Sequence, residues 1–154
     1  MAQYTSVVNA TSHATLNTEE SWIEILPPSA VSVLLKRIRV SFPFTTVSDV
    51  PCEIRVTRAS AGGATGTSGT ITERRPNGPA SVSTSTIKNG TSAFTVGTVV
   101  DTVMRVTVNT RGVFEWVARD ERDVIESGTN QRVCILLKIN VASCVTDVEC
   151  DWEE

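Results

Sequence analysis

Along most of the chain, hydrophobic and polar side chains alternate at single-residue spacing. Ile38 and Val40 alternate with Arg37, Arg39 and Ser41, and the same period recurs at residues 52–57, 104–109 and 146–153. Successive side chains of a β-strand point to opposite faces, so this pattern gives each strand one face for a core and one for solvent. The chain is therefore predicted to be all-β, with antiparallel sheets.

Strands are predicted at residues 21–26, 33–42, around Ile54, and at 81–87, 96–108, 113–118, 124–125, 133–141 and 145–152. Residues 133–137 are apolar on both parities, which is typical of a central strand that is covered on both sides. Strands at this spacing favour two packed sheets, so the predicted fold is an antiparallel two-sheet β-sandwich of jelly-roll topology.

The 154 residues are enough for one domain with its own core. Residues 1–18 are polar and alternate only weakly, which predicts an edge strand or an extended N-terminal arm. Residues 19–154 are then a single sandwich domain. It contains a Gly/Ser/Thr-rich loop at about 59–81, which is either a contact loop or a flexible connection.

Charge and hydropathy narrow the classes of partner. The net charge is -3, and the basic residues are scattered, which argues against a nucleic-acid surface. No apolar run is long enough to span a bilayer, so no membrane partner is expected. Residues 1–10 lack the basic and apolar regions of a signal peptide, which predicts synthesis and residence in a cytoplasm.

The cysteines are expected to be reduced core residues. Cys52, Cys134 and Cys150 share parity with apolar strand positions or have apolar neighbours, where a free thiol behaves as a small hydrophobe. With Cys144 they form no C-x-x-C pair, and His13 is the sole histidine. A zinc site would lack ligands, so neither a metal nor another cofactor is expected.

Acidic residues are the only dense functional group. Residues 119–123 combine the acids Asp120, Glu121 and Asp123 with arginines. Such a segment can be a solvated turn with weak ion pairs, a cation site or the acid pair of a small hydrolase. The solvated turn is favoured, because adjacent turn residues do not converge by themselves. The acids along the last strand are interpreted as protection of an edge strand against pairing with other chains.

Aromatic and nucleophilic residues give weaker signals. Trp22, Trp116 and Trp152 would suit sugar stacking if exposed, but tryptophans on an apolar parity are more often core residues. A Ser-His-Asp arrangement would have to recruit His13 from the polar N-terminal segment. The chain is therefore not expected to be an enzyme.

Four short motifs and the acid-tipped last strand occur in a definite order: AGGATGT at 61–67, GVFEW at 112–116, ESG at 126–128 and RVCIL at 132–136. From about Leu34 onward this order resembles a family of small β-sandwich proteins of tailed bacteriophages, found among capsid decoration (cement) and other accessory head proteins. The resemblance implies a virion protein, made in the host bacterial cytoplasm, that binds the outer capsid surface as a homotrimer and braces major capsid protein subunits.

On this interpretation, the N-terminal segment and the Gly-rich loop contact the partner. The residues expected to make the contact are Gln3, Tyr4, Val7, Asn9, Gly63, Thr65, Arg74 and Arg75. Two alternatives stay open. A tail, fibre or carbohydrate-binding virion module predicts exposed tryptophans, and a small hydrolase predicts a pocket with convergent acids.

Overall fold

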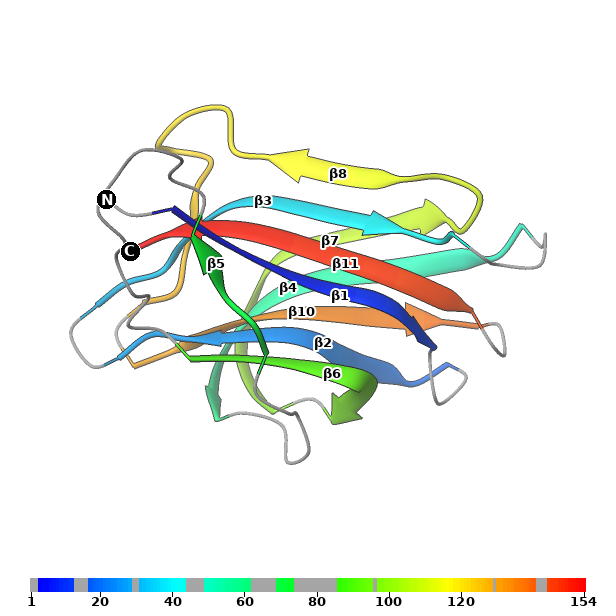
Figure 1. Cartoon of the computed structure of the whole chain (residues 1–154), viewed down its shortest axis with the longest axis horizontal. Coiled ribbons are helices and arrows are strands. Elements are labelled where there is room, and N and C mark those ends of the chain that lie inside the picture. The colour runs from blue at the N-terminus through cyan, green and yellow to red at the C-terminus, as the bar shows by residue number, and fades with distance from the viewer. Residues whose placement is uncertain are drawn as a thin grey trace.

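The computed structural model describes residues 3–12, 17–28, 31–43, 49–61, 69–73, 86–95, 97–128, 130–140 and 144–154. They form two antiparallel sheets that pack against each other, so the predicted all-β sandwich is confirmed (Figure 1). The first sheet contains β1 (Gln3–Ser12), β3 (Leu34–Ser41), β5 (Thr72–Glu73), β8 (Phe114–Val117), β9 (Ile125–Glu126) and β11 (Val145–Glu153). The second contains β2 (Glu19–Leu26), β4 (Pro51–Ala61), β6 (Thr86–Thr95), β7 (Thr98–Asn109) and β10 (Arg132–Ile139).

Eight of the strands pair in a nested order. β1 pairs with β11, β2 with β10, β3 with β8, and β4 with β7, so early strands meet late ones. The resulting orders are β5-β1-β11-β3-β8 in one sheet and β6-β2-β10-β4-β7 in the other. Successive strands β1 to β4 therefore alternate between the two sheets.

The core lies between the sheets and is built from the inward parity of each strand. Among its largest fully buried side chains are Trp22, Trp152, Ile38 and Ile135. β10 is central, as predicted, and Val133 to Leu137 are all buried. One face of β10 supplies the main core, while Cys134 and Leu136 form a second small cluster with Ala59.

The N-terminal segment is a strand of the sandwich. Gln3 pairs with Glu153 and Val8 with Val148 in the ladder with β11, and β1 and β11 run side by side in Figure 1. Tyr4 and Val8 point into the core, while Val7 and Gln3 are exposed. Residues 3–12 therefore form a strand of the first sheet, between β5 and β11.

The predicted loop at 59–81 contains more regular structure than its composition suggests. β4 continues to Ala61, β5 pairs with β1, and Ile71 packs against the core. Ser6 Oγ donates a hydrogen bond to the carbonyl of Thr70 at 3.0 Å. Strand β6 runs ten residues from Thr86, so it extends beyond the predicted end at 87. Its Asn-Gly pair is typical of a turn, and for this reason the sequence does not indicate a strand there.

The ESG motif at 126–128 has a structural explanation. The backbone N–H of Val33 donates to Ser127 Oγ, and the N–H of Ser127 donates to the carbonyl of Val33, both at 3.0 Å. Gly128 follows with a φ of 68°, a conformation that side chains disfavour. The turn thereby fixes the entry of the chain into β3.

Candidate functional site

The outer face of the β1-β11-β3-β8 layer is the best candidate for contact with a partner. We call it the acidic face. It comprises the outward residues of those strands: Gln3, Thr5, Val7, Arg37, Arg39, Glu115, Val117, Asp147, Glu149, Asp151 and Glu153. The strand register places Val7, Glu149, Arg39 and Glu115 in one row across four strands, and Thr5, Asp151, Arg37 and Val117 in the next.

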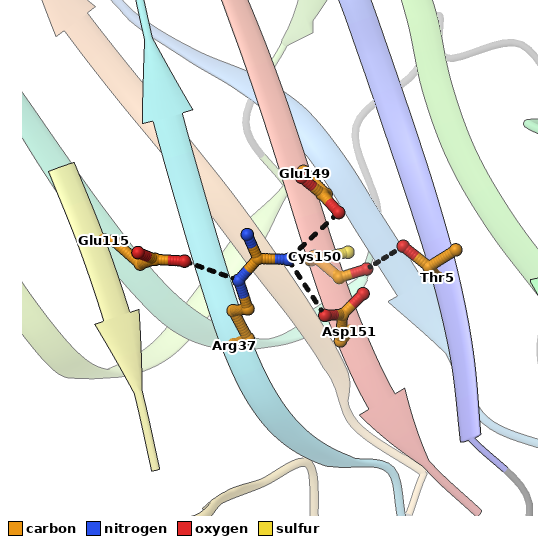
Figure 2. A network of polar contacts seen from close by, with 6 residues as sticks. All are labelled: Thr5, Arg37, Glu115, Glu149, Cys150 and Asp151. Atoms are coloured by element: carbon orange, nitrogen blue, oxygen red, sulfur yellow. Dashed lines mark hydrogen bonds and ion pairs between the residues drawn. The ribbon is translucent and has the colours of Figure 1, made fainter. Parts of the chain in front are cut away.

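Arg37 joins three strands at the centre of this face (Figure 2). Its Nε lies 2.7 Å from Glu115 Oε1, and its Nη1 lies 3.0 Å from Glu149 Oε1 and 3.3 Å from Asp151 Oδ2. The hydrogen bond with Glu115 raises the pKa of Arg37 well above its ordinary value, against the opposing effect of partial burial. One guanidinium thus holds carboxylates of β8 and β11 in place.

A second ion pair fixes the end of the face. Glu153 accepts a hydrogen bond from Gln3 Nε2 at 2.9 Å, and its other oxygen lies 3.3 Å from Lys36 Nζ. The hydrogen bond from Gln3 is the largest single cause that lowers the pKa of Glu153; the hydrogen bond and charge of Lys36 also lower it, and partial burial opposes them. Gln3 is therefore both exposed and tied to the last strand.

The interpretation of the last strand as a protected edge is wrong. β11 lies between β1 and β3 and pairs with both. Its outward acids alternate with the inward residues Val148, Cys150 and Trp152, and they face cations that β3 supplies. The acids therefore form a charged surface on the outer face of a central strand.

Three shallow hollows line this side of the molecule. One of about 170 Å³ lies between Val7, Asn9, Arg39, Ser41, Asp147 and Glu149. One of about 210 Å³ is lined by Gln3, Lys36, Arg37, Val117, Ala118, Asp151 and Trp152. A third of about 260 Å³ lies beside Leu34, Lys36, Glu121, Val124, Glu126 and Glu153. All three are smaller than typical ligand pockets of roughly 300–1,000 Å³, which suits side chains of a docked protein better than a cofactor.

The predicted contact residues fall into three groups. Gln3, Val7 and Asn9 are exposed on the acidic side, and each lines a hollow. Tyr4 is only 3% exposed, and its ring lies 5.9 Å from that of Trp152 between the sheets. The remaining four, Gly63, Thr65, Arg74 and Arg75, lie outside the described residues.

Sequence reasoning missed the residues that organise this face. The sequence pattern gave no functional role to Arg37, Arg39 or Val117 and placed them only on the polar face or within a strand. A signal was present, because Arg37 and Arg39 have the same two-residue spacing as the acids of the last strand. The sequence alone does not show that β3 pairs with β11, because about a hundred residues separate the two strands.

The other candidate groups lie beside this face or inside the fold, and Glu121 lines the third hollow together with Glu153. Asp120, Glu121 and Asp123 are exposed in a turn, in which Asp120 Oδ1 accepts a hydrogen bond from the N–H of Arg122 at 2.7 Å. Trp22 and Trp152 are buried, and Trp116 is half-buried on β8.

All four cysteines are buried without a disulfide, as predicted. Within the described ranges, no cluster of three or more potential metal ligands occurs. The same ranges hold no helix with the length and hydropathy needed to cross a membrane. Comparison with protein-family models, curated proteins and solved structures yields no match for this chain.

Proposed function

We propose that this chain is a jelly-roll structural protein of a bacteriophage virion. It binds the outer surface of the capsid and stabilises contacts between major capsid protein subunits. The observation that carries the proposal is the nested pairing of eight strands, first with last and inward to β4 with β7. A long hairpin rolled into two sheets has this pairing, and such sandwiches are common in viral capsid and lectin domains.

The acidic face supports a docking role because its charges are held in place before a partner arrives. Arg37 and Lys36 fix several of its carboxylates, so binding costs little side-chain ordering. Val7 and Val117 are 41% and 53% exposed among these charges and offer apolar contact area. A partner surface with basic and apolar groups fits this face, and many copies on one lattice allow each contact to be weak.

Co-sedimentation tests the proposal. Shells of the major capsid protein from the same phage are mixed with purified chain, either wild type, Val7→Lys or Thr107→Lys. Both substitutions put a lysine at an exposed strand position opposite a glutamate, Glu149 for Val7 and Glu53 for Thr107. The new charge lies on the acidic face in Val7→Lys and on the other sheet in Thr107→Lys.

We expect saturable binding of wild type and Thr107→Lys, and at least about tenfold weaker binding of Val7→Lys, the loss typical of a central contact. Absence of wild-type binding to the shells would refute the capsid role. Equal binding of all three proteins would show that the acidic face is not the contact.

A carbohydrate-binding virion module is the second candidate, and Trp116 is the observation that favours it. Its side chain is half-buried on the short edge strand β8, where one ring face can meet a sugar. Binding of the chain to host-cell glycans that Trp116→Ala abolishes, without binding to capsid shells, would establish this function in place of the first.

A further inference from the structure

The two flanks of the sandwich are built differently. On one flank, β5 continues the first sheet beyond β1, and β6 continues the second beyond β2. On the other flank, the sheets end at β8 and β7, and no strand of the described part of the chain pairs with their outer edges. We call β7, β8 and the turn at 110–113 the open flank; Figure 1 places β8 and β6 at opposite margins of the molecule.

The core reaches the surface along the open flank. The inward side chains of β7 and β8 pack against the main core, yet they are only half-buried: Met104, Val106, Val108, Phe114 and Trp116. The inward residues of their neighbours, such as Ile54 on β4 and Ile38 on β3, are completely buried. Apolar surface that belongs to the core is therefore left in contact with water along this flank.

Exposed valines concentrate on the same flank. Val100, Val103 and Val113 are three of the five large hydrophobic side chains that are exposed among the described residues; a fourth, Val117, belongs to the edge strand β8 but lies on the acidic face. Val103 and Val100 are extra residues where the register of β7 against β4 shifts. Bulges re-aim side chains, and here they turn two valines outward. Apolar side chains exposed along one edge of the sandwich favour an interaction surface there.

The charges of the open flank are neutralised within the chain. Arg58 pairs with Asp101 at 3.1 Å, Arg105 with Glu53 at 2.7 Å, and Arg111 with Asp49 at 3.0 Å. The acidic face, in contrast, carries more carboxylates than basic groups. Two copies can meet through their open flanks without bringing like charges together, whereas two acidic faces repel each other.

We propose that the open flank is a self-association surface, through which two copies of this chain bind flank to flank. The 12 residues of β7 extend about 40 Å and the four residues of β8 about 13 Å, so both sheet edges lie side by side along only part of the flank. Such a strip fits a weak contact that buries less than about 1,200 Å² in total.

The contact is made by side chains rather than by a continuous sheet. The bulges interrupt the regular edge of β7, which limits main-chain pairing with a second copy. A flank that packs on itself is isologous and closes at two copies. The homotrimer implied by the phage resemblance would instead join the flank to a different surface, so the mass in solution distinguishes the two arrangements.

Analytical ultracentrifugation of the full chain, up to about 200 µM, tests the proposal. We expect wild type to approach twice the chain mass of 16.6 kDa. Val103→Lys and Val113→Lys are expected to raise the dimer dissociation constant at least about tenfold, because each buries a charge in the contact. Val7→Lys, on the acidic face, is the matched control and is expected to dimerise like wild type.

Thermal unfolding of each variant checks that the sandwich is intact. A wild-type protein that stays monomeric at the highest concentration would overturn the proposal, and so would a trimer that the flank substitutions leave unchanged. Dissociation by Val7→Lys alone would also overturn it. The inference is independent of the proposed function, because Val7→Lys is expected to lose capsid binding and keep the dimer, while the flank variants lose the dimer.

Discussion

Replacement of Tyr4 tests whether the N-terminal segment is a structural strand. Tyr4 is 3% exposed, and its ring packs at 5.9 Å from Trp152, which is completely buried. Residues in this position would be solvated if the segment were a mobile arm. If the segment is a strand of the sandwich, Tyr4→Ala removes a large side chain from the core. If it is a mobile arm, the substitution changes almost nothing.

The expected loss follows from the burial. Truncation of a buried aromatic side chain to alanine costs about 3–5 kcal/mol, and this includes the roughly 0.5–1.5 kcal/mol of the ring pair. We take about 3–4 kcal/mol for Tyr4, because its position near the end of β1 allows some collapse of the site. For a chain of this length, that loss lowers the Tm by about 10 °C. A domain with about 5–15 kcal/mol of stability would still fold.

Urea unfolding, followed by tryptophan fluorescence, measures the difference. Val7→Ala is the matched control, since Val7 lies on the same strand with 41% of its surface exposed. Its expected effect is less than about 0.5 kcal/mol. Equal and small losses for both substitutions would refute the placement of β1 in the sandwich, whatever the capsid-binding data show.

Three further predictions follow from buried or paired polar groups. Ser127→Ala leaves the N–H of Val33 without its 3.0 Å acceptor and is expected to cost about 1–3 kcal/mol in urea unfolding; a loss within error would contradict this hydrogen bond. The pKa of Glu153 is lowered, chiefly by the hydrogen bond from Gln3, so its carboxylate stabilises the fold above the unfolded pKa of about 4.3 and loses this contribution as the pH falls through the folded pKa. Glu153→Gln is expected to flatten the fall in unfolding free energy in that acid range, and an unchanged slope would count against the pairing. Burial raises the pKa of Cys52 to about 12, so stability is expected to fall as the pH rises above about 8.5, where unfolded thiols ionise. No thiol of the native chain should then react with a disulfide reagent at pH 8, and rapid labelling without urea would disprove burial.

The alternation of side chains was sufficient to predict most strands and their inward faces. Ile38 and Val40 on β3, and Val148 and Cys150 on β11, are buried as their parity requires. This works because half-buried strands must repeat every two residues, whatever they pair with. The apolar run that became β10 was also predictable, since a short apolar run among other strand patterns is typical of a strand covered on both sides.

Pairing partners were not predictable from the same pattern. The acids of β11 look like edge protection when the strand is considered alone, and their true neighbours on β3 lie far away in the sequence. The ion pairs of Arg37 depend on that strand pairing, so no local sequence motif predicts them. Strand β6 was largely missed because its Asn-Gly pair has turn chemistry, which the pairing with β2 overrides.

The insertion between β4 and β7 links these observations to the two proposed surfaces. In the nested order, β4 and β7 are neighbours, so a short hairpin would have connected them at the open flank. Instead, the chain leaves β4 at Ala61 and next forms β5 and β6, at the opposite flank, before it returns as β7. The Gly-rich composition at 59–81 suggested a contact loop, yet the described part of the insertion covers the edges of β1 and β2. The chain thus covers one flank with its own strands and leaves core side chains half-exposed on the open flank. That flank is available to another copy, and the acidic face between the flanks stays available to a different partner.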